Sequence, residues 1–258
     1  MNLKGKKAVV TGGGRGIGAA VARALAAEGA AVVISARSTA EIEDLAVELR
    51  KSGGQAWAAP CDVTDPEQVS ALAREARERL GQVDILVNNA GIAASAPLKR
   101  IRLDHWNRIF AVNATGTFLC TQAFLPDMVQ RRWGRVVNVA SIAGLSGAAY
   151  ISAYAASKHA VVGFTRCIAA EVAPSGVTVN AVCPGYVETD MVTESVARIV
   201  EKTGLSEEEA RGSILKMNPQ DRILDPEEVA YQVVCLCDPR ARGVNGQTIV
   251  IDGGGLLS

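Results

Sequence analysis

The stretch TGGGRGIG, residues 11–18, joins a short apolar run to a long alanine-rich one and decides the fold. The run at 6–12 predicts a strand, and the alanine-rich residues 18–29 predict a helix. Glycines at such a junction let the backbone turn tightly, and the helix N-terminus offers free N–H groups to a phosphate. A nucleotide site is therefore predicted here, with a purely structural turn as the alternative. Its residues would be Gly12, Arg15, Gly16, Ile17 and Gly18.

The rest of the chain repeats this alternation of strand and helix. Near-continuous apolar strands between helices predict a parallel sheet covered on both faces. Since no linker or change in composition divides the chain, we predict one α/β domain over 1–258, a Rossmann-type doubly wound sheet of about seven strands. Further strands are expected at 31–36, 55–63, 83–91, 134–141, 177–185 and 247–255, and further helices at 39–51, 65–81, 104–131, 153–173 and 225–238.

Composition limits the classes of function. Basic and acidic residues are balanced at 27 each, so we expect no binding to nucleic acid. The N-terminus has no signal- or transit-peptide pattern, and no apolar run reaches about 18 residues, which predicts a cytoplasmic protein without a membrane partner. The six cysteines form no CxxC pair and there are only two histidines, so we expect free thiols and no metal site.

The end of the second strand bears on which dinucleotide binds. NAD-selective folds usually place an acidic residue about 20 residues after the glycines, where it holds the ribose hydroxyls. Here Ala36, Arg37 and Ser38 fill the position, and the first acid is Glu41. The guanidinium groups of Arg37 and Arg15 suit a 2′-phosphate. The sequence therefore favours NADP(H) and leaves NAD(H) open, the alternative being that both arginines are solvated surface residues.

A tyrosine and a lysine lie four residues apart in SAYAASKHA, residues 152–160. On a helix, residues i and i+4 share a face, so Tyr154 and Lys158 can reach one cleft. Ser141 closes the predicted fifth strand, and strand ends in such sheets point into the ligand crevice. The three side chains suit proton transfer to a carbonyl that accepts a hydride. Taken alone, the pair has an equally good structural explanation: a half-buried tyrosine beside a lysine whose ammonium reaches water.

The charge of Lys158 is large enough to affect the pKa of Tyr154. The pKa of a tyrosine is about 10, and bringing it near 7 takes about three units, or roughly 4 kcal/mol. An ammonium at about 5 Å supplies roughly 3 kcal/mol at an effective dielectric constant near 20. We therefore expect Lys158, together with oxidised nicotinamide, to lower the pKa of Tyr154 toward neutrality.

An ordered set of motifs connects these sites. TGGGRGIG is followed by NNAG at 88–91, Asn113 in VNATGTF, Ser141, YAASK at 154–158 and PGYVETD at 184–190. In this order they resemble the short-chain dehydrogenase/reductase family, in its compact single-domain branch, over essentially the whole chain. The resemblance implies an NAD(P)(H)-dependent enzyme that interconverts a ketone and a secondary alcohol.

The resemblance also implies a role for each motif. Tyr154 would be the general acid/base, and Ser141 would hydrogen-bond the substrate oxygen. Lys158 would bind the nicotinamide ribose, and Asn113 would hold a water that relays protons toward Lys158. The other cofactor-binding positions, from the adenine to the carboxamide, would be Asp62, Val63, Asn89, Ala90, Gly91, Pro184, Gly185, Val187 and Thr189. The substrate pocket would be framed by Ile92, Ala93, Leu145, Ala149 and Tyr186, beside Ser141 and Tyr154.

The substrate is predicted less narrowly than the reaction. The implied pocket is mostly apolar, which suits a 3-oxoacyl thioester or a lipophilic ketone, and the polar segment 188–217 would be a lid over it. These features look most like 3-oxoacyl-thioester reductases, with secondary alcohol dehydrogenases acting on small or cyclic alcohols as the alternative. Carrier-protein reductases of the family often have a basic residue where this chain has Ser175, so coenzyme A esters and free ketones stay open.

Two other classes of protein share this kind of fold. A non-catalytic NADP-binding sensor would not need Asn113, Ser141, Tyr154 and Lys158 together. Sugar-nucleotide epimerases and dehydratases carry a C-terminal substrate domain, for which we expect no room here. The family resemblance further implies a homotetramer, or a homodimer, built on the predicted helices at 104–131 and 153–173.

Overall fold

A single twisted sheet organises the protein. The computed structural model describes residues 1–257, so Ser258, the last residue of the predicted domain 1–258, lies outside the described residues. Within them, seven parallel strands pair in the order β3-β2-β1-β4-β5-β6-β7. The order reverses between β1 and β4, which is where ligands bind in such sheets. The strands are β1 (Lys7–Thr11), β2 (Ala31–Ser35), β3 (Gln55–Ala58), β4 (Ile85–Asn88), β5 (Gly134–Val139), β6 (Val177–Pro184) and β7 (Thr248–Ile251).

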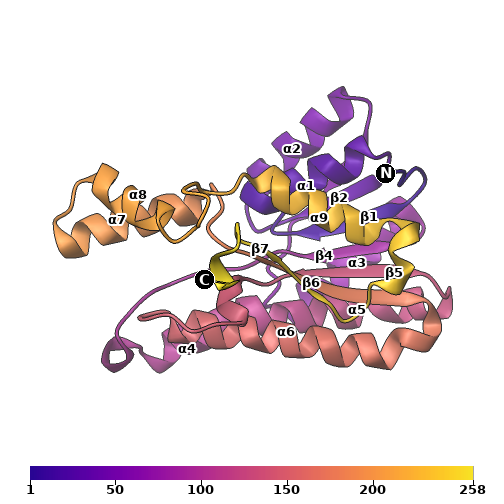
Figure 1. The fold of residues 1–258 in the computed structure, drawn as a ribbon. Coiled ribbons are helices and arrows are strands. Elements are labelled where there is room, and N and C mark those ends of the chain that lie inside the picture. The colour runs from indigo at the N-terminus through magenta and orange to yellow at the C-terminus, as the bar shows by residue number, and fades with distance from the viewer. Residues whose placement is uncertain (258) are drawn as a thin grey trace.

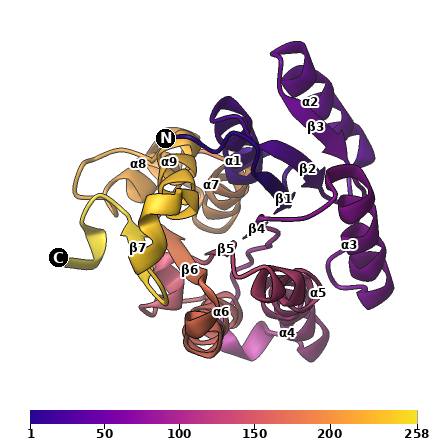
Figure 2. The same ribbon diagram turned by 90° about the vertical axis from the view of Figure 1, so that its right-hand side faces the viewer.

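Helices cover both faces of this sheet, which confirms the predicted doubly wound α/β domain. Helices α1, α2 and α9 lie on one face, and α3, α5 and α6 lie on the other (Figures 1 and 2). Among residues 1–257, no helix has both the length and the apolar character needed to span a membrane. The α-helices are α1 (Gly16–Ala27), α2 (Thr39–Lys51), α3 (Pro66–Leu80), α4 (Leu103–Phe110), α5 (Gly116–Gln130), α6 (Ser152–Val172), α7 (Asp190–Thr203), α8 (Glu207–Leu215) and α9 (Pro226–Cys237).

Each central strand supplies two cores at once. Along β1, Ala8 and Val10 belong to the core under α1, α2 and α9, while Val9 between them faces the core under α3 and α5. Successive side chains of a strand point to opposite faces, so a strand buried on both faces must be apolar throughout. This is why the sequence shows continuous apolar runs instead of alternation.

The helices expected at 65–81 and 225–238 each begin at an Asp-Pro pair. At α3, the carboxylate of Asp65 accepts hydrogen bonds from the backbone N–H groups of Glu67 and Gln68. At α9, Asp225 and Glu228 form a reciprocal capping box. Each proline follows its cap, where a missing N–H costs no hydrogen bond.

Several predicted boundaries are wrong at the carboxyl ends of strands. The third strand ends at Ala58, not at residue 63, and β5 ends at Val139, two residues before Ser141. Ser141 instead caps the short turn η3 (Ile142–Gly144), where its hydroxyl accepts a hydrogen bond from the Ala143 N–H. The predicted runs extend past the last ladder pair into Ala59 and Pro60 and into Ala140, which do not favour strands.

The predicted helix at 104–131 is interrupted at its functional position. A π-helical segment, η2 (Ala111–Thr115), separates α4 from α5 and carries Asn113 at its centre. Such π-segments are rare and occur frequently at functional sites. The amino-acid pattern gave no signal for it.

Helices α7 and α8 form a lobe of their own, which is called the α7–α8 lobe below. It projects from the sheet at the left of Figure 1. The two helices pack on each other around a separate small core made by Val192, Val196, Ala210, Ile214 and Ile223. Most of the polar segment 188–217 is therefore helical.

Candidate active site

The glycine loop after β1 has the shape that a dinucleotide requires. Gly12 has φ +61°, and a Cβ on it would lie 2.8 Å from the Ala90 Cα. A Cβ on Gly18 would lie 2.1 Å from the carbonyl oxygen of Gly12. Arg15, at the N-cap of α1, makes no side-chain capping hydrogen bond, and the first turn contains no acidic residue, so its N–H groups remain available to a phosphate. These features fit a dinucleotide pyrophosphate.

Asn89 ties this loop to the neighbouring strand end. Its side-chain amide donates hydrogen bonds to the carbonyl oxygens of Thr11 (3.1 Å) and Gly12 (2.8 Å). The backbone N–H of Asn89 also donates to the hydroxyl of Thr11. The NNAG motif therefore fixes the glycine loop, with Ala90 against Gly12, while a Cβ on Gly91 would lie 3.5 Å from the Lys158 Nζ.

Both signs of charge surround the predicted adenosine end of the cleft. Arg37 is exposed at the end of β2, and its charge contributes to lowering the pKa of Asp62. One oxygen of Asp62 is engaged in an Asx turn with Thr64. Glu41, which follows the expected acidic position in the sequence, lies against Gly14: a Cβ on that glycine would meet the Glu41 carboxylate at 3.1 Å. Only the folding of α2 against the loop brings this acid to the site.

Arg15 was predicted to face a phosphate, but in the structure it pairs with a carboxylate. Its guanidinium pairs with the carboxylate of Asp190 at 2.8 Å, at the N-terminus of α7. Close by, a Cβ on Gly16 would meet the Thr189 methyl group at 3.0 Å. The glycine loop therefore contacts the first residues of the α7–α8 lobe.

The three predicted catalytic side chains meet at the carboxyl edge of the sheet. The η3 turn that follows Ser141 packs directly on α6, because a Cβ on Gly144 would lie 2.8 Å from the Lys158 carbonyl oxygen. Tyr154 and Lys158 lie one turn apart on α6, with the Lys158 Nζ 5.8 Å from the centre of the Tyr154 ring. The Ser141 hydroxyl lies close enough to Tyr154 to lower the pKa of its phenol.

Lys158 is buried and does not reach water as a surface lysine would. Its ammonium donates a 2.8 Å hydrogen bond to the carbonyl oxygen of Val139, the last residue of β5. No carboxylate among the described residues pairs with it, and burial lowers the pKa of Lys158 to about 8. At this pKa the side chain can exchange a proton near neutral pH.

The pKa of Tyr154 moves opposite to the sequence-based prediction. Burial raises it, and the neighbouring Ser141 hydroxyl opposes this only in part. Lys158 is not among the groups that lower the pKa of Tyr154, and desolvation of the phenolate is the largest effect on it. The protein groups alone therefore keep Tyr154 protonated.

Asn113 joins three elements around the catalytic residues. Its side-chain oxygen accepts from the Ile92 N–H at 2.8 Å, and its amide donates to the Ile92 carbonyl at 2.9 Å. The same amide donates to the hydroxyl of Ser157 at 3.0 Å, one residue before Lys158. Both amide hydrogens are thus used within the protein. Ser157, which sequence reasoning did not single out, is the link between η2 and α6.

The predicted carboxamide side of the cleft lies after β6. Pro184 ends this strand, and a Cβ on Gly185 would be 3.2 Å from the side chain of Asp252 after β7. Val187 is buried and pairs with Leu224, and the Thr189 hydroxyl donates to the Val187 carbonyl. The segment is thereby held beside the glycine loop.

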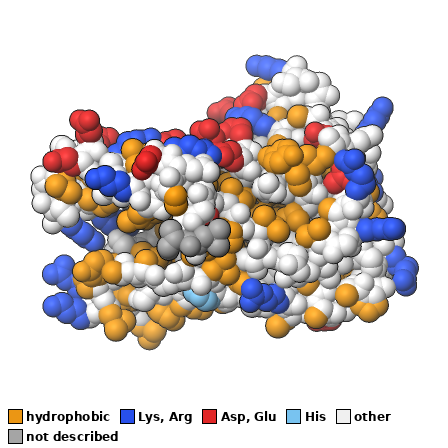
Figure 3. Space-filling model, viewed as in Figure 1, with side chains coloured by type: hydrophobic (Ala, Val, Ile, Leu, Met, Phe, Trp, Pro, Cys, Tyr) orange, Lys and Arg blue, Asp and Glu red, His pale blue; other side chains and the backbone are white. Residues whose placement is uncertain are grey.

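An apolar cleft opens next to these groups. The space-filling view is hollowed between the α7–α8 lobe and the layer that carries α4 and α6 (Figure 3). Tyr186 is near enough to Tyr154 to affect its pKa. Ala93 and Leu145 are partly buried, whereas Ala149 is exposed in the loop before α6. On the η1 (Leu98–Arg100) and α4 side, Leu98 and Leu103 are 79% and 74% exposed.

Comparison with known proteins agrees with this geometry. The family model for the short chain dehydrogenase matches residues 6–199. The chain belongs to the short-chain dehydrogenase/reductase family. As a member, it is an NAD(P)(H)-dependent oxidoreductase that interconverts ketones and secondary alcohols.

Individual relatives and a solved structure match this family member over nearly its whole length. It is 40% identical over 255 residues to the 3-oxoacyl-[acyl-carrier-protein] reductase FabG of Vibrio cholerae, a match covering 98% of each chain. It is 38% identical over 253 residues to the D-beta-hydroxybutyrate dehydrogenase of Cupriavidus necator, again covering 98% of each chain. A crystal structure of an actinorhodin polyketide ketoreductase variant with NADPH superposes with a TM-score of 0.94 and 39% identity, covering 96% of each chain.

Proposed function

We propose that this protein uses NADPH to reduce 3-oxoacyl thioesters to 3-hydroxyacyl thioesters. The proposal rests on one observation: Ser141, Tyr154 and Lys158 lie close together beside the glycine loop, at the mouth of an apolar cleft. A sensor of NADP would have no use for a buried lysine that can exchange protons next to a half-buried tyrosine.

The side chains have distinct tasks in this reaction. A bound nicotinamide supplies the hydride to the carbonyl carbon. Ser141 donates a hydrogen bond to the carbonyl oxygen, and Tyr154 donates its proton to that oxygen as negative charge develops. Because its pKa is raised, Tyr154 is fully protonated at neutral pH, which suits the direction of reduction.

Lys158 restores the proton and holds the cofactor in place. With a pKa of about 8, its ammonium can return a proton to Tyr154, through a water held near Asn113 as the family resemblance implies. The same ammonium binds the nicotinamide ribose. Asn113 fixes the position of Ser157, and with it the turn of α6 that carries Lys158.

NADP(H) is the cofactor that the adenosine end of the cleft favours. Arg37 is exposed and forms no hydrogen bond within residues 1–257, so its guanidinium is available to a 2′-phosphate. Arg15 reaches the same phosphate when it leaves Asp190. The remaining predicted contacts, from Asp62 and Val63 to Val187 and Thr189, are part of this proposal.

The cofactor assignment is tested by Arg37→Asp. The added carboxylate repels a 2′-phosphate and can hold ribose hydroxyls, so the ratio of kcat/KM for NADPH to that for NADH should fall at least about 100-fold. Arg74→Asp makes the same charge change on the exposed face of α3 and should leave the ratio unaltered. An unchanged ratio in Arg37→Asp contradicts the assignment.

The substrate class is supported by the apolar cleft and by the relatives. Ile92, Ala93, Leu145 and Tyr186 offer an acyl chain apolar contact. Two of the matched relatives are named for a 3-oxoacyl and for a 3-hydroxy acid substrate. A secondary alcohol dehydrogenase acting on a free hydroxy acid or a cyclic alcohol is the second candidate.

A substrate panel separates these candidates. Oxidation of NADPH is followed by absorbance with the acetoacetyl thioester of N-acetylcysteamine, with acetoacetate and with a bicyclic ketone. The proposal expects the thioester to have the highest kcat/KM. A preference for acetoacetate overturns the thioester assignment while keeping the reaction class, and no turnover of any substrate with either cofactor overturns the enzymatic function.

We further propose that the α7–α8 lobe is the lid of this cleft. Its separate core and its few polar ties to the body, Arg15–Asp190 and Arg198–Ser95, allow it to move as a unit. A cysteine pair joining Ser95 to Arg198 should lock it when oxidised and lower kcat, with recovery on reduction. Retained turnover of the oxidised form contradicts a lid.

Assembly and location are the last parts of the proposal. The free cysteines suit the reducing cytoplasm.

Phe118 on α5 is 42% exposed and forms an edge-to-face contact with Phe164 on α6, which supports a homotetramer, or a homodimer, built on these helices. Phe118→Asp should reduce the mass measured by light scattering. An unchanged mass places the interface elsewhere.

A further inference from the structure

A basic groove lies at the opposite end of the sheet from the catalytic side chains. It has a volume of about 630 Å³ and opens where β5 and β6 begin, beside the short helix η5 (Pro239–Gly243). Its lining includes three arginines and no acidic residue. The polar and aromatic residues that matter are Arg132, Trp133, Arg135, Thr178, Arg242 and Asn245.

Arg135 forms the inner wall of this groove. It is the second residue of β5 and only 2% exposed. Its Nη1 donates to the carbonyl oxygens of Gly134 (2.8 Å) and Gly176 (3.4 Å). Its Nε is buried without a hydrogen-bond partner, and its Nη2 donates to no residue in 1–257. The free Nε–Nη2 edge is the side of a guanidinium that binds an oxyanion through two parallel hydrogen bonds.

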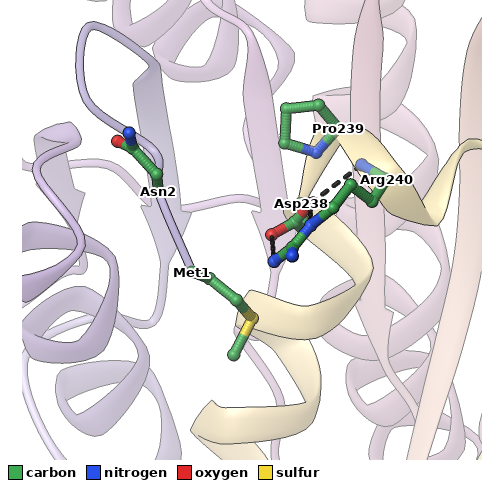
Figure 4. A pocket seen from close by; sticks show the side chains of 5 residues that line it. All are labelled: Met1, Asn2, Asp238, Pro239 and Arg240. Atoms are coloured by element: carbon green, nitrogen blue, oxygen red, sulfur yellow. Dashed lines mark hydrogen bonds and ion pairs between the residues drawn. The ribbon is translucent and has the colours of Figure 1, made fainter.

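The neighbouring carboxylate of Asp238 forms no hydrogen bond with the Nε–Nη2 edge of Arg135. Asp238 is close enough for its charge to act on Arg135, but it is engaged elsewhere. Figure 4 shows the Arg240 guanidinium folded back on the Asp238 carboxylate, with Arg240 Nε and Nη2 at 2.9 and 2.8 Å from its two oxygens. This pair belongs to a neighbouring cavity of about 440 Å³ that also involves Met1 and Asn2. Arg135 is thus a buried cation without an anionic partner.

The surroundings add positive charge to the groove. The Trp133 ring has the Lys6 Nζ at 3.5 Å and the Arg135 Cζ at 4.8 Å from its centre. Arg242 is exposed and makes no hydrogen bond to the described part of the chain, whereas Arg132 donates to the Pro174 carbonyl. Burying a charge without a partner is unfavourable, so a buried cation in a cationic groove indicates a missing anion.

We propose that this groove is a binding site for a small oxyanion, a phosphate or a carboxylate group. The anion lies against Nη2 of Arg135 and reaches the buried Nε by a small opening of the groove, with Arg242 and Arg132 closing over it and the Trp133 ring as one wall. The inference does not depend on the proposed function. Ser141 lies six positions after Arg135 along the strand and turn, about 20 Å away, so the bound anion does not touch the reacting groups.

The test uses Trp133 as a local reporter in the complex with NADP⁺. Saturating NADP⁺ occupies the cofactor's own phosphate sites. With 5-fluorotryptophan in place of tryptophan, Trp57, Trp106 and Trp133 give three ¹⁹F signals, and Trp133→Phe assigns one of them. Sodium phosphate, and in a second arm sodium malonate, is titrated against sodium chloride at equal ionic strength. The Trp133 signal should shift saturably while the other two do not, and the stronger arm identifies phosphate or carboxylate as the preferred group.

Variants separate a built site from general attraction to positive charge. Arg242→Gln should raise the dissociation constant about tenfold, and Arg135→Lys, which keeps the charge but loses the two-pronged edge, should abolish saturation. Arg74→Gln removes one exposed arginine from α3 and should change nothing. The proposal is overturned if no saturable shift occurs below about 100 mM of either anion, if chloride reproduces it, or if Arg242→Gln binds as the wild type does.

Discussion

Two buried cations lie at opposite ends of β5, and neither has a carboxylate partner among residues 1–257. At the carboxyl end, Lys158 is 5% exposed and donates to the carbonyl oxygen of Val139. At the amino end, Arg135 is 2% exposed and donates to the carbonyl oxygen of Gly134. Burial lowers the pKa of both side chains, that of Lys158 to about 8. The same strand thus holds both cations through its backbone.

The difference lies in what each cation can do with its environment. A lysine with a pKa near 8 can give up its proton at physiological pH, so burial converts it into a proton donor and acceptor. An arginine keeps its charge in proteins, so burial converts it into a permanent attractor of anions. One end of the sheet therefore suits proton transfer and the other suits anion binding.

Tyr154→Phe should have the largest effect, since it removes the proton that the carboxyl end delivers. We expect kcat to fall about 10³-fold or more, corresponding to about 4 kcal/mol, with the dissociation constant for NADPH nearly unchanged. Steady-state kinetics on the best substrate and fluorescence titration of the cofactor measure the two quantities.

Tyr231→Phe is the matched control for this variant. Tyr231 lies on α9, is 57% exposed and should tolerate the same loss of a hydroxyl with unchanged kcat. Turnover of Tyr154→Phe at the wild-type rate would falsify proton transfer by Tyr154. The carboxyl end of β5 would then no longer differ in function from the amino end.

Lys158→Met should reveal the titration of the buried lysine in the stability of the protein. The folded pKa of about 8 lies below the ordinary value of 10.5, so the unfolded chain binds the extra proton between these pH values. Stability therefore rises with pH in this window, and wild type should gain about 3 kcal/mol over Lys158→Met between pH 8 and 10.5. Urea denaturation at several pH values measures this difference.

The result for Lys158→Met is compared with Lys51→Met as control. Lys51 is exposed at the end of α2 and should give a difference that does not vary with pH. If the difference in unfolding free energy between wild type and Lys158→Met also does not vary with pH, the ammonium titrates as it would in water. Lys158 is then not the proton carrier proposed.

Arg135→Met should have a smaller effect that depends on anions and not on pH. Because arginine does not titrate, the difference in unfolding free energy from wild type should be constant between about pH 8 and 10.5. Adding about 50 mM phosphate should stabilise wild type by about 1 kcal/mol by linkage and should leave Arg135→Met unaffected. Denaturant unfolding with phosphate or with chloride at equal ionic strength measures both. Equal stabilisation of the two proteins removes Arg135 as the anion ligand.

Arg15→Ala should have the smallest effect on stability, since it concerns an exposed cation that does have a carboxylate partner. The side chains of Arg15 and Asp190 are 64% and 63% exposed, and such pairs contribute less than about 0.5 kcal/mol. Thermal unfolding of Arg15→Ala and Asp190→Ala should therefore resemble wild type. A loss above about 1 kcal/mol for either variant shows that the α7–α8 lobe is held more firmly than a lid allows.

The sequence predicted the parts of the site that depend on local pattern. Glycine spacing placed the loop after β1, because only glycine tolerates the contacts at Gly12 and Gly18. A spacing of four residues put Tyr154 and Lys158 on one face of α6, and Asp-Pro pairs located two helix starts. Apolar runs without alternation indicated a parallel sheet with two covered faces.

Only the tertiary structure decided what depends on neighbours distant in the chain. The pKa of Tyr154 rises instead of falling because burial is set by packing and not by the lysine one turn away. The π-helical turn at Asn113 and its link to Ser157 arise from the contact between η2 and α6. The free edge of Arg135 exists because Arg240 neutralises Asp238. Local sequence sets backbone geometry through short-range sterics, whereas desolvation and partnering of charges are decided by which segments the fold brings together.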